Sequence, residues 1–132
     1  MSESKYDNFK FDKIRNLEGN LKYSNLHIVE FSGKLEMESI YSGVRIDQVL
    51  PSFENMKITN ERGAYKIGIS PETSFDLYAD SERGEISVSG FNILEKKTDG
   101  SNKFIHATNG TKGTNKIINI SLKEGSLSLF KM

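Results

Sequence analysis

Apolar and polar residues alternate along most of the chain with a period of two, and the alternation falls into repeated units. Each unit centres on a turn residue, here called the anchor; the anchors are Tyr6, Tyr23, Tyr41, Arg62, Arg83 and Glu124. Three residues after them stand Phe9, Leu26, Val44, Tyr65, Ile86 and Leu127, and five after them stand Phe11, Ile28, Ile46, Ile67, Val88 and Leu129. The intervening residues are polar, namely Lys10, His27, Arg45, Lys66, Ser87 and Ser128. This alternation predicts a strand with one buried face after each anchor.

The segment before each anchor follows the same rule. Six residues upstream stand Leu17, Leu35, Met56, Leu77 and Ile118, and four upstream stand Gly19, Met37, Ile58, Ala79 and Ile120. Each unit is therefore predicted as strand, turn, strand. One or two residues after the anchors come Asn8, Asn25, Gly43, Gly63, Gly84 and Gly125. Because glycine and asparagine tolerate the left-handed conformation, we expect them to make the sharp corner.

The spacing between anchors is nearly constant until the last interval. Successive anchors are 17, 18, 21, 21 and 41 residues apart. The long interval contains Asp99-Gly100, a dipeptide that favours a type I′ hairpin turn. We therefore interpret residues 92–116 as a coil enlarged by a β-hairpin.

Two all-β architectures could use such units. In an antiparallel sandwich the two strands of a unit pair with each other, whereas in a β-solenoid each strand pairs in parallel with its equivalent in the next unit. Like residues recur at like positions, as stacking of equivalent positions requires, and repeats of about 20 residues suit a solenoid. We predict one domain over residues 1–132, a single-stranded parallel β-helix of about five or six coils with a hairpin insertion near residues 92–116.

The ends of a solenoid expose unpaired strand edges. The first unit has no strand before Tyr6, so either Met1 to Asp12 form a cap, further coils precede the sequence, or another molecule covers the edge. End-to-end homodimerisation is the corresponding expectation.

Composition narrows the function classes only slightly. The 132 residues carry 18 Lys and Arg against 18 Asp and Glu, so the balance does not indicate a nucleic-acid partner. There is no cysteine, which excludes disulfides, thiolate metal sites and a cysteine nucleophile. No apolar run approaches the roughly 18–20 residues of a membrane helix, and the first residues show no signal-peptide pattern.

The segments Tyr41-Ser-Gly-Val-Arg-Ile, Ser74-Phe-Asp-Leu and Arg83-Gly-Glu-Ile-Ser-Val make the chain resemble the bacterial putative-adhesin domain family. The likeness runs from Tyr6 to Leu129. It implies a right-handed parallel β-helix, export to the periplasm or cell surface, and a binding or structural role without known catalysis. The family supplies no catalytic residues that could be transferred to this chain.

Candidate binding residues lie at outward positions of the predicted strands and turns. Arg62 and Arg83 share the anchor position and suggest a basic corner for an anionic glycan or a protein. Tyr78 lies in a polar column, where an exposed aromatic ring could contact a sugar or a protein. Glu18 and Glu36, followed by Lys57, form a predicted ladder. The alternative interpretation of each set is that its residues are ordinary solvated surface residues without a binding role.

No catalytic, cofactor or metal site is predicted. His27 and His106 are the only histidines, and both are interpreted as surface residues of strands. We therefore expect a non-enzymatic module of the cell envelope. A self-polymerising scaffold like the bactofilins is the second hypothesis, and a small glycan-cleaving enzyme that uses Glu18 or Glu36 is the third.

Overall fold

The computed structural model describes residues 3–5, 8–109 and 116–131. These residues form eleven strands and, within those ranges, no helix. The strands are β1 (Glu3–Lys5), β2 (Asn8–Lys22), β3 (Asn25–Ile40), β4 (Gly43–Glu61), β5 (Ala64–Ile69), β6 (Phe75–Glu82), β7 (Glu85–Ser89), β8 (Asn92–Asp99), β9 (Asn102–Asn109), β10 (Ile117–Lys123) and β11 (Ser126–Lys131). The predicted all-β class is confirmed. In the described residues no helix is long and apolar enough to cross a membrane.

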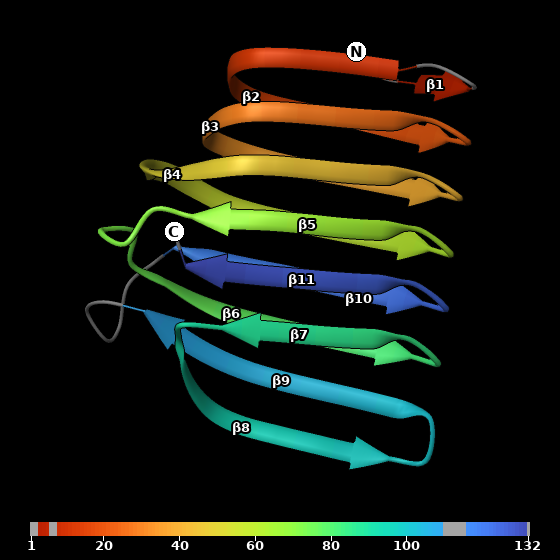
Figure 1. Ribbon diagram of the computed structural model, residues 1–132, viewed down its shortest axis with the longest axis vertical. Helices are drawn as coiled ribbons and strands as arrows, with labels where there is room; N and C mark the ends of the chain where they lie inside the picture. The colour runs from red at the N-terminus through yellow and green to blue at the C-terminus, as the bar shows by residue number, and fades with distance from the viewer. Residues whose placement is uncertain (1–2, 6–7, 110–115, 132) are drawn as a thin grey trace.

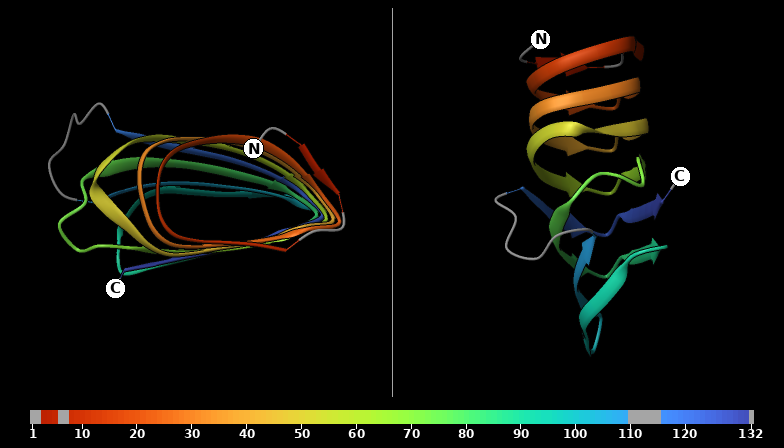
Figure 2. Two further views of the ribbon diagram at one scale, coloured as in Figure 1. Left: turned by 90° about the horizontal axis from the view of Figure 1, so that it is seen from above. Right: turned by 90° about the vertical axis from the view of Figure 1, so that its left-hand side faces the viewer.

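All eleven strands belong to one sheet that curls round so that two of its parts face each other (Figures 1 and 2). The long strands β2, β3 and β4 pass along one part, bend, and return along the other. The β5 wall contains the first halves of these three strands, followed by β5, β11 and β7. The β6 wall contains β1, the second halves of the same strands, and then β10, β6, β9 and β8.

Equivalent positions of neighbouring strands lie side by side in parallel pairs. Ile46 pairs with Ile67, and Leu35 pairs with Met56, as the repeated columns require. The apolar columns point between the two walls and form the core, in which Ile28, Ile46, Ile67 and Leu129 are fully buried. Phe9, Phe11, Ile86 and Val88, at the two ends of the stack, are only half-buried. Period-2 patterning thus correctly predicts which face of each strand is covered.

The order of strands in space differs from their order in the chain. β10 lies between β4 and β6, with Ile118 paired to Met56 on one side and to Leu77 on the other. β11 likewise lies between β5 and β7. The unit anchored at Glu124 is therefore inserted between the units anchored at Arg62 and Arg83. A simple winding in chain order, which the sequence suggested, is wrong at this point.

The sheet is mixed and open. β9 runs antiparallel to β6, and β8 runs antiparallel to β9, so residues 92–109 form a hairpin at the lower end. Asp99 pairs with Asn102, which places Gly100 and Ser101 at the centre of the turn. Gly100 has a φ of 60°, whereas the φ of Ser101 is not positive. This is the pattern of a type II′ turn, so the predicted type I′ turn on Asp99-Gly100 is wrong by one residue.

The corners are made by the anchors themselves. Tyr23, Tyr41, Arg62, Arg83 and Glu124 have φ between 52° and 55°, whereas the expectation placed this conformation on the following glycine or asparagine. Tyr6 lies outside the described residues. Main-chain hydrogen bonds join each corner to the next: the N–H of Tyr41 donates to the Glu61 carbonyl, and that of Arg62 donates to the Lys123 carbonyl. These non-glycine residues thus have positive φ at the points where their N–H groups bond to the neighbouring unit.

The corner glycines are needed for a different reason, the close approach of neighbouring units. A Cβ added to Gly84 would lie 2.2 Å from the Gly125 carbonyl oxygen, and one added to Gly63 would lie 2.1 Å from the Ser42 carbonyl oxygen. These obstacles are main-chain atoms that the hydrogen bonds of the corner hold in place. A side chain at either position would therefore force the stacked units apart.

We predict that Gly84→Ala lowers the free energy of unfolding by about 3 kcal/mol, because the new methyl group overpacks the contact with Gly125. Gly100→Ala is the matched control, since nothing lies within 4 Å of its Cβ position. It should cost about 1–2 kcal/mol, because alanine must adopt the positive φ of this turn position. Urea unfolding followed by circular dichroism measures both. Equal losses in the two variants would contradict close stacking at the corner.

Candidate binding face

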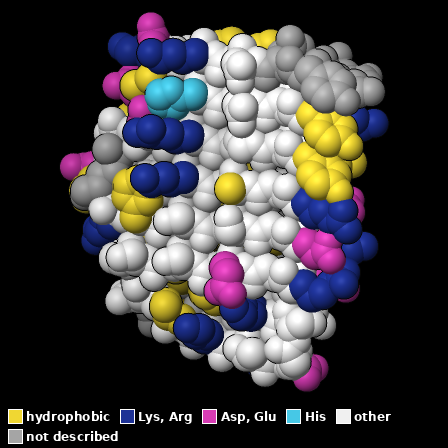
Figure 3. Space-filling view, turned by 45° about the vertical axis from the view of Figure 1, so that its right-hand side comes forward, with side chains coloured by type: hydrophobic (Ala, Val, Ile, Leu, Met, Phe, Trp, Pro, Cys, Tyr) yellow, Lys and Arg dark blue, Asp and Glu magenta, His cyan; other side chains and the backbone are white. Residues whose placement is uncertain are grey.

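The outer face of the β5 wall carries a column of basic side chains. Register pairs join Lys10 to His27, His27 to Arg45, and Arg45 to Lys66. Neighbouring positions in such a column are about 4.8 Å apart, because strands stack at that distance. We call these four residues the basic column. Figure 3 shows it as a vertical row of Lys, His and Arg side chains on one side of this face.

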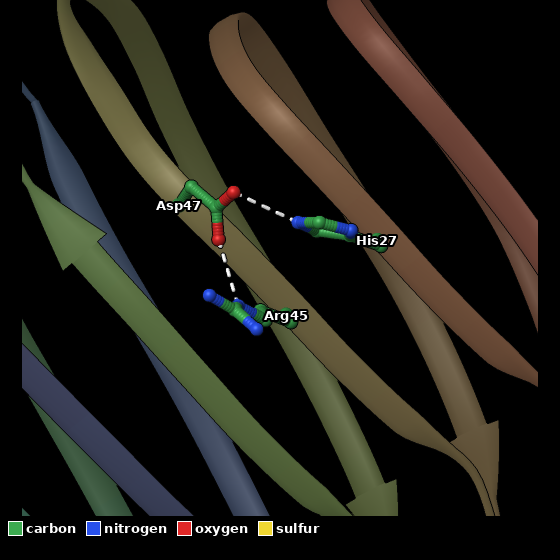
Figure 4. A network of polar contacts seen from close by, with 3 residues as sticks. All are labelled: His27, Arg45 and Asp47. Carbon is green, nitrogen blue, oxygen red and sulfur yellow. Dashed lines mark hydrogen bonds and ion pairs between the residues drawn. The ribbon is translucent and has the colours of Figure 1, made fainter.

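Two members of the basic column share a carboxylate. Asp47 Oδ2 lies 2.8 Å from His27 Nε2, and Arg45 Nε donates to Asp47 Oδ1 at 2.8 Å (Figure 4). Partial burial raises the pKa of the Asp47 carboxyl, but the hydrogen bonds from His27 and Arg45 outweigh it and bring the pKa below its ordinary value of 3.8. The Arg45 side chain remains 61% exposed, so its guanidinium group can still reach a ligand.

The two lysines of the basic column, unlike His27 and Arg45, have no carboxylate partner among the described residues. Lys10 and Lys66 form no ion pair with any residue of the described ranges. Lys66 Nζ lies 5.9 Å from the centre of the Phe130 ring, a cation–π contact that leaves the ammonium group at the surface. Within the described residues the column therefore holds two cations without a carboxylate partner and one, Arg45, that is paired with Asp47 but remains exposed.

A shallow groove of about 690 Å³ runs across the same face. Its outward lining includes the basic column residues His27, Arg45 and Lys66. Asn25, Ser128 and Ser87 add side chains that can donate and accept hydrogen bonds. The groove thus combines cations on successive strands with neutral polar groups, and one exposed carboxylate, that of Glu85, lines it as well and pairs with Lys103.

The corners form a second column along the edge of this face. Tyr23 and Tyr41 stack with ring centres 5.1 Å apart and an angle of 5° between the rings. The Arg62 guanidinium carbon lies 5.4 Å from the centre of the Tyr41 ring, and Arg62 also donates a hydrogen bond to the Tyr41 hydroxyl. Since each ring faces the next corner, the stack exposes ring edges to solvent. The aromatic pair therefore supports the register of the corners.

Arg62 and Arg83, proposed from the sequence as a basic corner, share the carboxylate of Glu124. Arg62 Nε lies 2.5 Å from Glu124 Oε2, and an Arg83 terminal nitrogen lies 3.0 Å from Oε1. The two arginines are two units apart in space because the Glu124 unit lies between them. The corner consequently carries two positive charges and one negative charge, held in a fixed arrangement.

The other sequence candidates lie on the β6 wall, away from the basic column. Glu18 pairs with Glu36, and Glu36 pairs with Lys57, as the predicted ladder requires. Tyr78 is 37% exposed and stacks on His106, with ring centres 4.3 Å apart. The structure therefore does not bring the five candidates into a single site. It places Arg62 and Arg83 together and leaves Glu18 with Glu36, and Tyr78, elsewhere.

Sequence reasoning missed the basic column as a unit. The sequence pattern identifies its four residues only as polar positions between two apolar columns, and their shared basic character is the signal that could have linked them. Stacking turns that recurrence along the chain into proximity in space. In residues 3–5, 8–109 and 116–131 no group of three or more His, Cys, Asp or Glu side chains is arranged to hold a metal ion.

We predict that Glu124→Gln destabilises the fold at neutral pH and has a smaller effect in acid. The hydrogen bond from Arg62 lowers the pKa of Glu124 below 4.5, with further lowering by the charges of Arg62 and Arg83. The stability gained from this carboxylate is thus complete above 4.5 and disappears as the pH falls through the lower folded-state pKa. The melting temperatures of wild type and Glu124→Gln, measured from neutral pH to below pH 4.5, give the size of this effect. Glu38→Gln is the control at an exposed position. A difference between wild type and Glu124→Gln that does not change with pH would contradict the assignment.

Comparisons with known proteins give little further guidance. No protein-family model matches the chain, and no curated protein matches it. Among solved structures it is similar to one described as a putative cell adhesion protein from Clostridium sporogenes, with 13% sequence identity and a TM-score of 0.44. The match covers 86% of this chain and 56% of that one, so the chain spans about half the length of that protein.

Proposed function

We propose that the chain is a non-enzymatic, adhesin-like binding module that holds an extended anionic glycan against the outer face of its β5 wall. In this proposal the curled sheet is a right-handed parallel β-helix with one unit inserted out of order and a hairpin added at its end. The module works in the bacterial cell envelope, in the periplasm or at the cell surface. The observation that carries the proposal is the basic column beside the groove.

The spacing of the column suits a polymer rather than a single small ion. Strand stacking repeats the cations about every 4.8 Å along a straight line, so a chain with regularly spaced acidic groups can meet several of them in succession. Carboxylate and sulfate groups match the donors of Arg45 and the ammonium groups of Lys10 and Lys66. The hydroxyl groups of Ser87 and Ser128, on the next two strands of the same column, can bond to sugar hydroxyls.

The two histidines differ in their surroundings. His27 Nε2 is engaged with Asp47, and no hydroxyl group of the described residues hydrogen bonds to its other ring nitrogen. An activated serine needs a histidine that is within hydrogen-bond distance of it. His106 is stacked under Tyr78, and its Nε2 is buried without a hydrogen-bond partner in the described chain. His27 lines the groove with its Nε2 held by Asp47, whereas His106 lies on the β6 wall away from the groove.

We predict that the protein binds polygalacturonate or heparin and does not bind neutral dextran. The triple variant Lys10→Gln, Arg45→Gln, Lys66→Gln should bind about tenfold more weakly, because it loses charge-assisted contacts worth about 1.5 kcal/mol or more in total. Isothermal titration calorimetry at two salt concentrations measures the affinity, and a reducing-end assay measures any turnover.

The matched control removes an equal number of positive charges from the β6 wall. Its three substitutions are Lys34→Gln, Lys57→Gln and Lys123→Gln. This variant should keep the wild-type affinity. Equal losses in both triple variants would show that only total charge matters, and absence of binding to either acidic polymer would contradict the proposal. Turnover of a polymer would overturn the non-enzymatic assignment.

A self-polymerising scaffold is the second candidate, and it is favoured by an open strand edge. Among the described strands β7 pairs only with β11, and its inward residues Ile86 and Val88 are half-buried. The edge of the β6 wall is less suited to pairing, since β8 is exposed throughout and carries Lys96 and Lys97. End-to-end association should then join the β7 edge of one copy to the first half of β2 in the next copy, since residues 8–15 pair only with β3 among the described strands. Light scattering that gives a monomer mass at all concentrations would rule it out.

A further inference from the structure

The unit formed by β10 and β11 fills a slot in the middle of the sheet. Its two neighbours, β4 with β5 and β6 with β7, precede it in the chain and are joined to each other directly through residues 70–74. That connection passes over the position that the later unit occupies. Strand edges from two earlier units of the chain therefore border the slot that residues 117–131 fill (Figure 1). We call these residues the exchange unit.

The exchange unit is bonded along both of its edges. β10 has seven register pairs with β4 and seven with β6, and β11 has six with β5 and five with β7. Its apolar residues complete the core: Ile118, Ile120 and Leu129 are fully buried, and Leu122 and Leu127 nearly so. Without it, the slot would expose unpaired N–H and C=O groups on both sides together with the apolar residues they carry.

The corner of the slot adds contacts that select this unit. The Arg62 N–H donates to the Lys123 carbonyl, and the Glu124 N–H donates to the Glu82 carbonyl. The Glu124 carboxylate lies between Arg62 and Arg83. A carboxylate at this corner fits two arginines that would otherwise repel each other across the slot. Parallel pairing, apolar pattern and corner charge thus specify the sequence that fits.

We propose that the slot accepts the exchange unit of a second copy of this chain, so that two copies form a dimer by reciprocal exchange. Every contact that the slot makes with the unit is available whichever copy supplies it, which is the condition for domain swapping at low cost. Insertion of a strand from another molecule is a recurring mode of association in sheets. In dilute solution each slot binds the exchange unit of its own chain, because that unit has the higher effective concentration. At high protein concentration the exchanged dimer forms.

A cysteine pair distinguishes the exchanged dimer from other associations. Ser87 and Ser128 are paired on β7 and β11, about 4.8 Å apart, which suits a disulfide, and the natural sequence has no cysteine. In Ser87→Cys, Ser128→Cys the disulfide lies within one chain in the monomer and between two chains in the exchanged dimer. The control, Glu18→Cys with Glu36→Cys, joins β2 to β3 and stays within one chain in either state.

Each full-length variant is unfolded in urea, refolded at low and at high protein concentration, separated by size, and then oxidised. We expect the dimer fraction to rise at least about tenfold at high concentration. On a non-reducing denaturing gel that fraction should run as a covalent dimer for the Ser87–Ser128 variant and as a monomer for the control. No dimer at any concentration, or a dimer that both variants resolve into monomers, would overturn reciprocal exchange; the second result would identify end-to-end contact instead.

Discussion

Close main-chain stacking at the corners is the constraint on which the rest of the molecule depends. Each anchor from Tyr23 to Glu124 accepts a left-handed backbone that costs a non-glycine residue about 1–2 kcal/mol. In return, its N–H bonds to a carbonyl of the neighbouring unit, and the strands on both sides of the corner enter in register. Gly63 and Gly84 permit this approach because main-chain oxygens of the neighbours occupy the space of a Cβ. The register of both walls follows from the corners.

That register determines the chemistry of the surface. Because equivalent positions stack, a polar position that recurs along the sequence becomes a straight column of side chains. On the β5 wall the result is the basic column, and at the edge it is the stack of Tyr23, Tyr41 and the arginines that share Glu124. The same fold places Glu18 beside Glu36 on the opposite wall. The surface proposed to bind an extended ligand is therefore produced by the repeat, without a dedicated loop.

Much of the fold can be predicted from the sequence, because alternation of apolar and polar residues reports burial directly. Ile28, Ile46 and Ile67 lie where the pattern places them, and the hairpin after residue 92 is also indicated by its turn residues. The order of the units cannot be predicted in the same way. Leu127 suits a position beside Tyr65 or beyond Ile86 equally well, since all three belong to one column. The left-handed anchors were missed because local propensity favours glycine, and here bonds between units override it.

Candidate site residues were less predictable, since their partners come from distant units. Arg62 and Arg83 share a position in the repeat, but Glu124 between them becomes apparent only with the inserted unit. The most direct test of this threading is an NMR measurement of contacts between main-chain protons of neighbouring strands. The account predicts contacts from Leu127 to both Tyr65 and Ile86, and none between Tyr65 and Ile86. Direct contacts between Tyr65 and Ile86, with Leu127 beside only Ile86, would contradict it.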